Sequence, residues 1–325
     1  MNRRRALNGL ALAGAAGVAA KTLWRPRLQR KSPTVSAVAV VNCPTYELCV
    51  SAVTDGLSLV RCDVRGKSVL LKPNLVEYSA AAPINTNPKL VTAVAEVLLQ
   101  RGAREVLIAD GPGHVRDTDL LLDESGFAEQ LRLLGRARFL DLNYDRTREC
   151  EARARITSLR TMWLPEAVLA ADVVISMPKI KTHHWAGVTL SLKNLFGVLP
   201  GSVYGWPKNV LHWEGIENSI VELAAAIPIH YVIADGVIAM EGNGPLHGSA
   251  RPLGCLVVAN DPVAADATCC RLMGIDPARV RHLAMAAPLG NLHSSSIEQR
   301  GESITALAQS FELLPQFAHL RASHP

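Results

Sequence analysis

Short apolar runs alternate with longer amphipathic stretches along most of the chain. The runs are rich in Val, Ile and Leu and end at Gly, Pro, Asn or Asp, which is the pattern of buried strands. They predict strands at residues 35–41, 67–71, 105–109, 139–142, 173–176, 230–234 and 253–259, with an edge strand at 158–163. Helical periodicity between the runs predicts helices at residues 47–60, 88–101, 117–134, 213–227, 262–273 and 277–287.

The regular alternation of strand and helix predicts the α/β class, with a largely parallel sheet covered by helices on both faces. Residues 173–176 (Val-Val-Ile-Ser) lack the period-two pattern of a half-exposed strand. They therefore predict a central strand that is buried on both faces.

The first residues differ from the rest of the chain in charge. Residues 1–31 carry eight Lys or Arg and no acid, whereas the remainder holds 26 basic and 29 acidic residues. The formal charge of +5 therefore belongs to this segment. Because the body has no basic excess, we expect it not to bind nucleic acid.

Arg3-Arg4-Arg5, an Ala- and Gly-rich apolar stretch and Lys21 follow one another as in a secretory signal. Residues 2–8 loosely match a twin-arginine pattern, which predicts export to the periplasm or cell envelope. The apolar stretch is short for a membrane span, and an uncleaved anchor or a disordered basic tail are the alternatives. We expect membrane contact only through this leader. The predicted parts are an export leader and basic linker (1–31), one α/β domain (32–290) and a C-terminal extension (291–325).

The seven cysteines lie without Cys-x-x-Cys spacing. The chain therefore contains no recognisable iron–sulfur or structural zinc motif.

Polar residues follow several of the predicted strands, and the tetrapeptide Ile-Ala-Asp-Gly does so twice, at 108–111 and 233–236. In a parallel sheet the carboxyl ends of the strands meet at one edge, so these residues are expected to share a crevice. They are Lys72, Asn74, Asp110, Lys179, Lys181, His183, His184, Asp235, Asn260 and Asp261.

Lysines in this crevice would attract a carboxylate or a phosphate. His183 and His184 could transfer protons near neutral pH, or bind a divalent metal with Asp110 or Asp235. Simpler interpretations stay open, because both aspartates could form Asx-turns. Asp261 is expected to cap the helix at 262–273.

Three further features concern the surroundings of the crevice. Asp266 is expected to be a solvated charge or a partner of a lysine. His212 and His247 are expected to be ordinary loop histidines. The Gly- and Pro-rich segments 199–209 and 240–252 are candidate lids.

Several of these motifs resemble a bacterial and archaeal family, the domain of unknown function 362. The resemblance covers about residues 65–290, and its most specific part is Pro-Lys-Ile-Lys-Thr-His at 178–183. It implies no settled activity. Some members carry a ferredoxin-like iron–sulfur segment, which this chain lacks. The other matching motifs are Leu-Lys-Pro-Asn (71–74), Ala-Asp-Gly (109–111 and 234–236), Leu-Lys-Asn-Leu-Phe-Gly (192–197) and Asn-Asp-Pro-Val-Ala-Ala-Asp (260–266).

Two functions agree with these patterns. The first is an enzyme that acts on a small carboxylate- or phosphate-bearing molecule by proton transfer or with a metal. The second is a non-catalytic module that binds an anion or a metallocofactor for a partner protein. The expected catalytic residues are Lys181, His183, Asp110 and Asp235, the ligand-binding residues are Lys72, Asn74, Lys179, Lys193 and Asn194, and the metal ligands are His183, His184 and Asp110.

Overall fold

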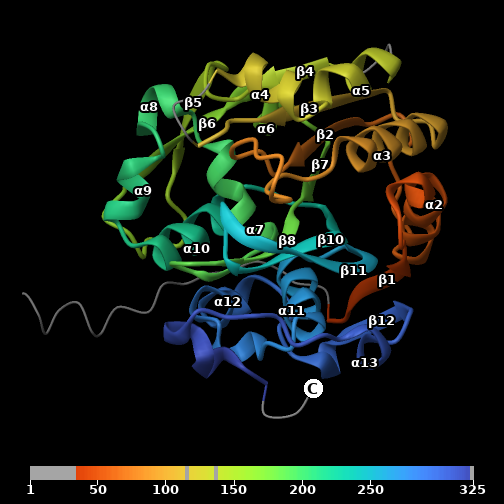
Figure 1. The fold of residues 1–325 in the computed structure, drawn as a ribbon. Coiled ribbons are helices and arrows are strands. Elements are labelled where there is room, and N and C mark those ends of the chain that lie inside the picture. The colour runs from red at the N-terminus through yellow and green to blue at the C-terminus, as the bar shows by residue number, and fades with distance from the viewer. Residues whose placement is uncertain (1–33, 114–116, 135–137, 323–325) are drawn as a thin grey trace, which may run out of the picture.

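A single mixed sheet runs through the computed structural model, which describes residues 34–113, 117–134 and 138–322 (Figure 1). Strand β11 is antiparallel to both of its neighbours, and the other pairs along the main path are parallel. This confirms the predicted largely parallel sheet. Its order is β12 (Ile297–Gly301), β1 (Ser36–Asn42), β11 (His247–Ala259), β10 (Tyr231–Asn243), β7 (Val173–Met177), β2 (Ser68–Pro73), β3 (Glu105–Asp110) and β4 (Arg138–Asp141).

Helices cover both faces of the sheet, as the sequence predicts (Figure 1). Successive residues of a buried strand point to opposite faces, so Val173 and Ile175 belong to one core and Val174 to the other. The first core contains α2 (Cys49–Leu59), α3 (Pro88–Gln100), α4 (Thr118–Glu124) and α5 (Phe127–Leu134). The second contains α7 (Ser191–Asn194), α10 (Ile216–Ala226), α11 (Pro262–Leu272) and α12 (Arg281–Ala286).

Strand β7 lies between β2 and β10 and is parallel to both. All five of its residues are buried. The predicted central strand is therefore confirmed.

The Lys- and His-rich segment after β7, whose composition predicts a polar loop, is a strand instead. Residues 179–183 form a further strand, β8 (Lys179–His183), which pairs in parallel with β10 and antiparallel with β9 (Gly187–Thr189). Pro178 has no N–H to donate, but it interrupts the ladder for only one residue. The apolar stretch at 186–197, whose composition favours a helix ending at Gly197, forms only α7 and a 3₁₀ turn, Leu195–Val198, because its first part pairs as β9.

Neither candidate lid is a free loop. Segment 240–252 forms the tip of the antiparallel hairpin between β10 and β11. Segment 199–209 contains α8 (Gly201–Tyr204) and leads into α9 (Asn209–Trp213). The possible edge strand is β6 (Thr161–Pro165), which pairs only with β5 (Thr147–Glu151) in a separate small sheet.

The stretch from residue 291 packs onto the domain. Its strand β12 pairs in parallel with β1 at the edge of the main sheet, and Phe311 and Leu320 join the second core. The leader at residues 1–31 lies outside the described residues. Within the described part, no helix is long and apolar enough to cross a membrane.

Candidate functional site

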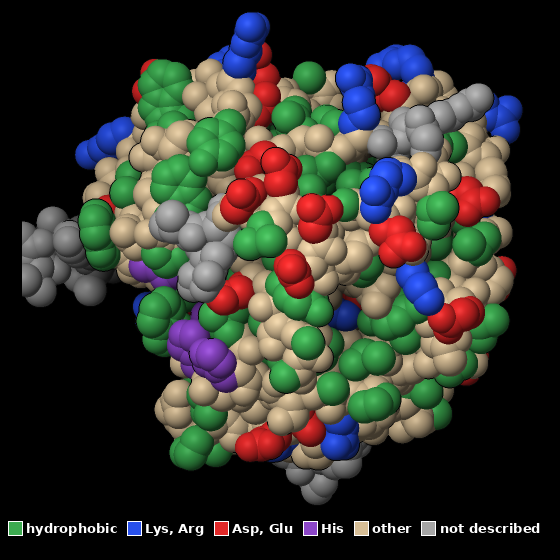
Figure 2. Space-filling view, turned by 45° about the horizontal axis from the view of Figure 1, so that its top comes forward, with side chains coloured by type: hydrophobic (Ala, Val, Ile, Leu, Met, Phe, Trp, Pro, Cys, Tyr) green, Lys and Arg blue, Asp and Glu red, His purple; other side chains and the backbone are tan. Residues whose placement is uncertain are grey.

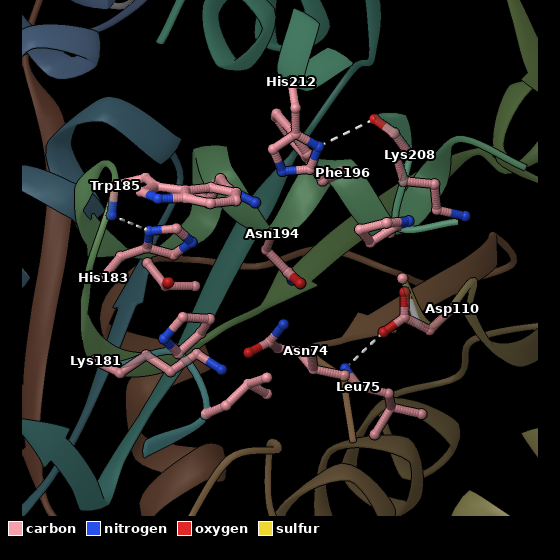
Figure 3. Close-up of a pocket in the computed structure, with 18 of the residues that line it drawn as sticks. Asn74, Leu75, Asp110, Lys181, His183, Trp185, Asn194, Phe196, Lys208 and His212 are labelled. Atoms are coloured by element: carbon pink, nitrogen blue, oxygen red, sulfur yellow. Dashed lines mark hydrogen bonds between the residues drawn. The ribbon is translucent and has the colours of Figure 1, made fainter. Parts of the chain in front are cut away.

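A cavity of about 210 Å³ lies where β2 and β3 end and β8 passes (Figure 3). Its polar wall contains eight of the predicted site residues and three others that the sequence did not single out for the site. The predicted ones are Lys72, Asn74, Asp110, Lys181, His183, His184, Lys193 and Asn194, and the additional ones are Thr189, Lys208 and His212. Of the ten residues expected to share a crevice, six line this cavity, and Lys179, Asp235, Asn260 and Asp261 do not.

Lys72 is held by the protein and has no donor left for a ligand. Its ammonium donates to the Asp110 carboxylate at 2.7 Å, to the Pro73 carbonyl at 3.0 Å and to the Asn194 side-chain oxygen at 3.1 Å. An ammonium group has three N–H donors, so all of them are used. Asp110 also accepts from the backbone amides of Leu75 and Gly111.

Lys179 and Asp235 form a second buried pair, and neither of them lines the cavity. Lys179 donates to Asp235 at 2.6 Å, to the Tyr46 hydroxyl at 3.0 Å and to the Ile238 carbonyl at 3.0 Å. Asp235 also accepts from the Asn87 amide and the Tyr46 hydroxyl. The repeated Ile-Ala-Asp-Gly sequence thus supplies, in each copy, an aspartate that pairs with a buried lysine. This geometry argues against the predicted catalytic role of both aspartates and against ligand binding by Lys179.

Three other lysines reach the cavity without such a partner. Lys181 is 0% exposed and donates to the Ile84 carbonyl at 2.7 Å, and Lys208 is 1% exposed and donates to the side-chain oxygen of Asn143. Lys193 is half-buried, with its ammonium 3.7 Å from the centroid of the Phe196 ring. Within the described residues, none of the three lies in a salt bridge with a carboxylate. These side chains therefore have unused N–H donors beside the cavity.

Burial makes the charged forms of these lysines unfavourable. It lowers the pKa of Lys181 far below its usual range, with a further contribution from the charges of Lys179 and Lys193. Burial and the charge of Lys72 lower the pKa of Lys193 to about 7. Burial lowers the pKa of Lys208 to about 8. An anion in the cavity would reverse all three shifts.

His183 is oriented by the backbone that follows it. Its Nδ1 accepts from the amides of Trp185 at 3.0 Å and Ala186 at 3.2 Å, so the proton of the neutral ring sits on Nε2 (Figure 3). Burial, and then the charge of Lys193, lower its pKa well below the usual range. His183 is therefore a neutral imidazole with an Nε2–H donor.

His184 and His212 carry the opposite tautomer. The Nδ1 of His184 lies 2.9 Å from the Gly244 carbonyl, and the Nδ1 of His212 lies 3.1 Å from the Lys208 carbonyl. A carbonyl oxygen only accepts, so Nδ1 carries the proton in both rings. In the neutral form of either ring, Nε2 is then the nitrogen with the lone pair.

The structure does not assemble the predicted metal set of His183, His184 and Asp110. The described residues contain no group of three or more His, Cys, Asp or Glu side chains that could hold a metal ion. The physical reason is that Asp110 is bound by Lys72 and two amides, while Nδ1 of each histidine bonds to the backbone.

Gly197 lines the cavity beside the Lys72–Asp110 pair, whereas Asp266 and Asp261 do not line it. A Cβ on Gly197 would collide with the Asp110 carboxylate and the Lys72 ammonium, so only glycine allows this backbone to approach the pair. Asp266 is fully buried and accepts from the amides of Ser191 and Leu192 at the start of α7. It is therefore neither the solvated charge nor the lysine partner that the sequence predicted. Asp261 caps α11, as expected.

Sequence reasoning missed Lys208 and wrongly treated His212 as an ordinary loop residue. Both follow the run Tyr-Gly-Trp-Pro at 204–207. Lys208 lies in the candidate lid at 199–209, and His212 lies in α9, just beyond it. The sequence feature that could have indicated Lys208 is its position directly after the aromatic residues of this segment. His114, which follows the predicted strand at 105–109, lies outside the described residues.

Comparisons with known proteins agree with these motifs. A thylakoid-associated protein of Synechocystis sp. is 32% identical over 232 residues, which cover 69% of this chain and 68% of that protein. Two solved structures share 13% identity at a TM-score of 0.42: a Thermotoga maritima protein and the lactate racemase apoprotein of Thermoanaerobacterium thermosaccharolyticum. The matches cover 71% and 70% of this chain, but only 60% and 55% of those two chains.

The model of one family matches residues 69–271, which include both Asp–Lys pairs and every polar residue that lines the cavity. The chain therefore belongs to the family described as a domain of unknown function, DUF362.

Proposed function

We propose that the cavity binds a small molecule with a carboxylate or phosphate group and that the protein is an enzyme acting on it by proton transfer. The observation that carries this proposal is the set of three lysines, Lys181, Lys193 and Lys208, whose ammonium groups lack a carboxylate partner in the described residues. Buried cations are normally paired. An external anion would supply the missing partner.

The chemistry of each group suggests its role. Lys181 and Lys208 hold the anionic group, because both are deep in the cavity and keep unused donors. Lys193, with a pKa of about 7, is poised to accept a proton at neutral pH. His183 donates its Nε2–H to an oxygen on which negative charge develops. Lys193 thus takes over part of the proton transfer that the sequence assigned to His183.

Binding is tested by calorimetry with acetate, malonate, inorganic phosphate and phenyl phosphate. We expect at least one of them to bind, and Lys181→Met to weaken it at least tenfold. Lys89→Met is the matched control, since Lys89 is an exposed lysine paired with Glu47 at the surface. Equal affinities in Lys181→Met and wild type would contradict the proposal.

Catalysis is tested by incubating the protein with a panel of small carboxylic acids and phosphate esters in D₂O. Exchange of a carbon-bound proton, seen by NMR and lost in Lys193→Met, would support proton transfer. The alternative function, a module that binds an anion or metallocofactor for a partner, predicts a tightly held ligand without exchange. Native mass spectrometry of the purified protein would detect that ligand.

We also propose that the protein works outside the cytoplasm, in the periplasm or cell envelope. The support is the signal-like layout of residues 1–31. A relative described as thylakoid-associated agrees with a location at a membrane.

A further inference from the structure

The cavity has a polar interior and an apolar mouth. Most of the buried lining residues are charged or polar, among them Lys181 (0% exposed), Lys208 (1%) and His183 (5%), alongside Leu75 and Phe196. The residues of the wall that are exposed or half-buried include several apolar ones, with Trp185 58% exposed. These apolar residues are Val76, Trp185, Pro207, Pro245 and Leu246.

The aromatic side of the mouth is built from rings that pack on one another (Figure 3). The Trp185 ring lies 4.7 Å from that of His184 and 5.4 Å from that of His212, measured between centroids. The His212 ring in turn lies 5.6 Å from that of Phe196. Both contacts of His212 are edge-on, so the rings support each other as one wall. An exposed tryptophan held in this way offers apolar surface to a ligand.

The face of the molecule drawn in Figure 2 carries charges of both signs. Lys/Arg and Asp/Glu side chains are interspersed over the face in Figure 2, where histidines lie beside hydrophobic side chains at one edge. This face therefore presents no continuous positive surface that would favour a long polyanion. The lysines of the cavity suit a single acidic group.

Resting on the proposed function, we propose that the ligand is an amphipathic anion: one carboxylate or phosphate group joined to an apolar chain or ring. The acidic group enters first and meets Lys181 and Lys208. The apolar part stays at the mouth against Trp185 and Leu246. The cavity volume is about 210 Å³, whereas one water molecule takes up roughly 30 Å³ in the liquid. The cavity therefore has more room than a small inorganic oxyanion fills, and such an anion would use only the interior.

The proposal predicts how affinity depends on chain length. Each methylene that leaves water contributes about 0.8 kcal/mol, which is roughly a fourfold gain in affinity. Calorimetry would compare inorganic, methyl, butyl and hexyl phosphate, and in parallel acetate, butyrate and hexanoate. We expect affinity to rise about fourfold per methylene in at least one series, and then to level off once the chain extends beyond the mouth.

Two tryptophan variants test whether the apolar part of the ligand contacts the cavity mouth and not exposed tryptophan in general. Trp185→Ala should remove most of the gain from butyl to hexyl phosphate and leave the affinity for inorganic phosphate unchanged. Trp213→Ala is the matched control, since Trp213 is 79% exposed and does not line the cavity. We expect it to behave like wild type.

The outcomes distinguish this inference from the proposed function. If short and long members of each series bind equally, the function stands and the amphipathic ligand is ruled out. If no member binds better to wild type than to Lys181→Met, the proposed function fails as well. Sedimentation with phosphatidic acid vesicles, released by hexyl phosphate, would identify a lipid as the source. Binding of hexyl phosphate without sedimentation would identify a free amphiphile, and either result supports the proposed chemistry.

Discussion

Replacing Lys72 or Lys181 by methionine should separate a lysine that holds the fold together from one that binds the ligand. The two lysines line the same cavity and are almost fully buried. Lys72 pairs with Asp110 at 2.7 Å. Removing one partner of a buried ion pair leaves an uncompensated charge and costs about 3–5 kcal/mol. At roughly 2–4 °C per kcal/mol for a domain of this size, Lys72→Met should lower the thermal midpoint by about 6–20 °C.

Lys181→Met changes stability through two opposing effects. The variant loses the hydrogen bond to the Ile84 carbonyl and leaves that oxygen unsatisfied, which costs about 1–3 kcal/mol. It also removes a cation whose charged form is disfavoured by burial and by the neighbouring charges of Lys179 and Lys193. The methionine side chain keeps most of the apolar stem. We therefore expect a net change below about 2 kcal/mol, together with loss of anion binding.

Urea unfolding would give both stabilities, and calorimetry with the best-binding anion would give both affinities. Lys89→Met should change the free energy of unfolding by no more than about 0.5 kcal/mol, as is usual for an exposed site. If Lys181→Met destabilises as much as Lys72→Met, both lysines belong to the scaffold. In that case unused N–H donors do not distinguish a ligand-binding lysine from a structural one.

Three further predictions concern the fold and the leader. Val174→Asp places an unpaired charge in the central strand and should cost several kcal/mol; a thermal midpoint within two degrees of wild type would contradict the buried position. Gly197→Ala should lower the free energy of unfolding by about 1–3 kcal/mol through overpacking against the Asp110 pair, and Gly113→Ala, at a position with open space for a Cβ, serves as its control in the same urea titration. The double variant Arg3→Lys/Arg4→Lys should keep the full-length protein in the cytosol on fractionation, whereas identical distribution of both proteins would refute the export signal.

The sheet could be predicted from sequence because its strands have apolar residues on both faces. Burial on two sides gives continuous Val- and Ile-rich runs such as 173–176, and these runs matched observed strands. Strand β8 carries Lys179, Lys181 and His183 on one face, so its composition resembles a solvated loop. Its pairing with β9 is a short hairpin, whereas its pairing with β10 is a distant contact that no local pattern reports.

The sequence could predict where the polar residues gather, but not which lysines are paired within the protein. Polar residues at parallel strand ends must converge, and Lys181, His183 and Lys193 do. Sequence cannot tell which lysine finds an internal carboxylate, because that depends on the three-dimensional position of each ammonium group. Lys179 lies two residues from Lys181, yet only the first meets Asp235.

Ligand binding should be coupled to proton uptake, because burial lowers the pKa of Lys193 and keeps this lysine partly neutral near neutral pH. Lys193 has a pKa of about 7 in the folded protein and about 10.4 when unfolded. The unfolded state therefore binds more protons between these values, so stability should rise with pH across this window. Anion affinity should fall over the same range, because the neutral amine attracts an anion less.

These opposite slopes can be measured in one set of samples. Urea unfolding between pH 6 and 10 should show the rise in stability for wild type and a smaller rise for Lys193→Met. Calorimetry with the same anion in two buffers of different ionisation enthalpy should show proton uptake at pH 8, which Lys193→Met reduces. A bound anion favours the charged lysine, so a saturating anion should also reduce the pH dependence of stability. If affinity is constant from pH 6 to 10 and no proton is taken up, Lys193 is already charged in the empty cavity and cannot serve as the proposed base.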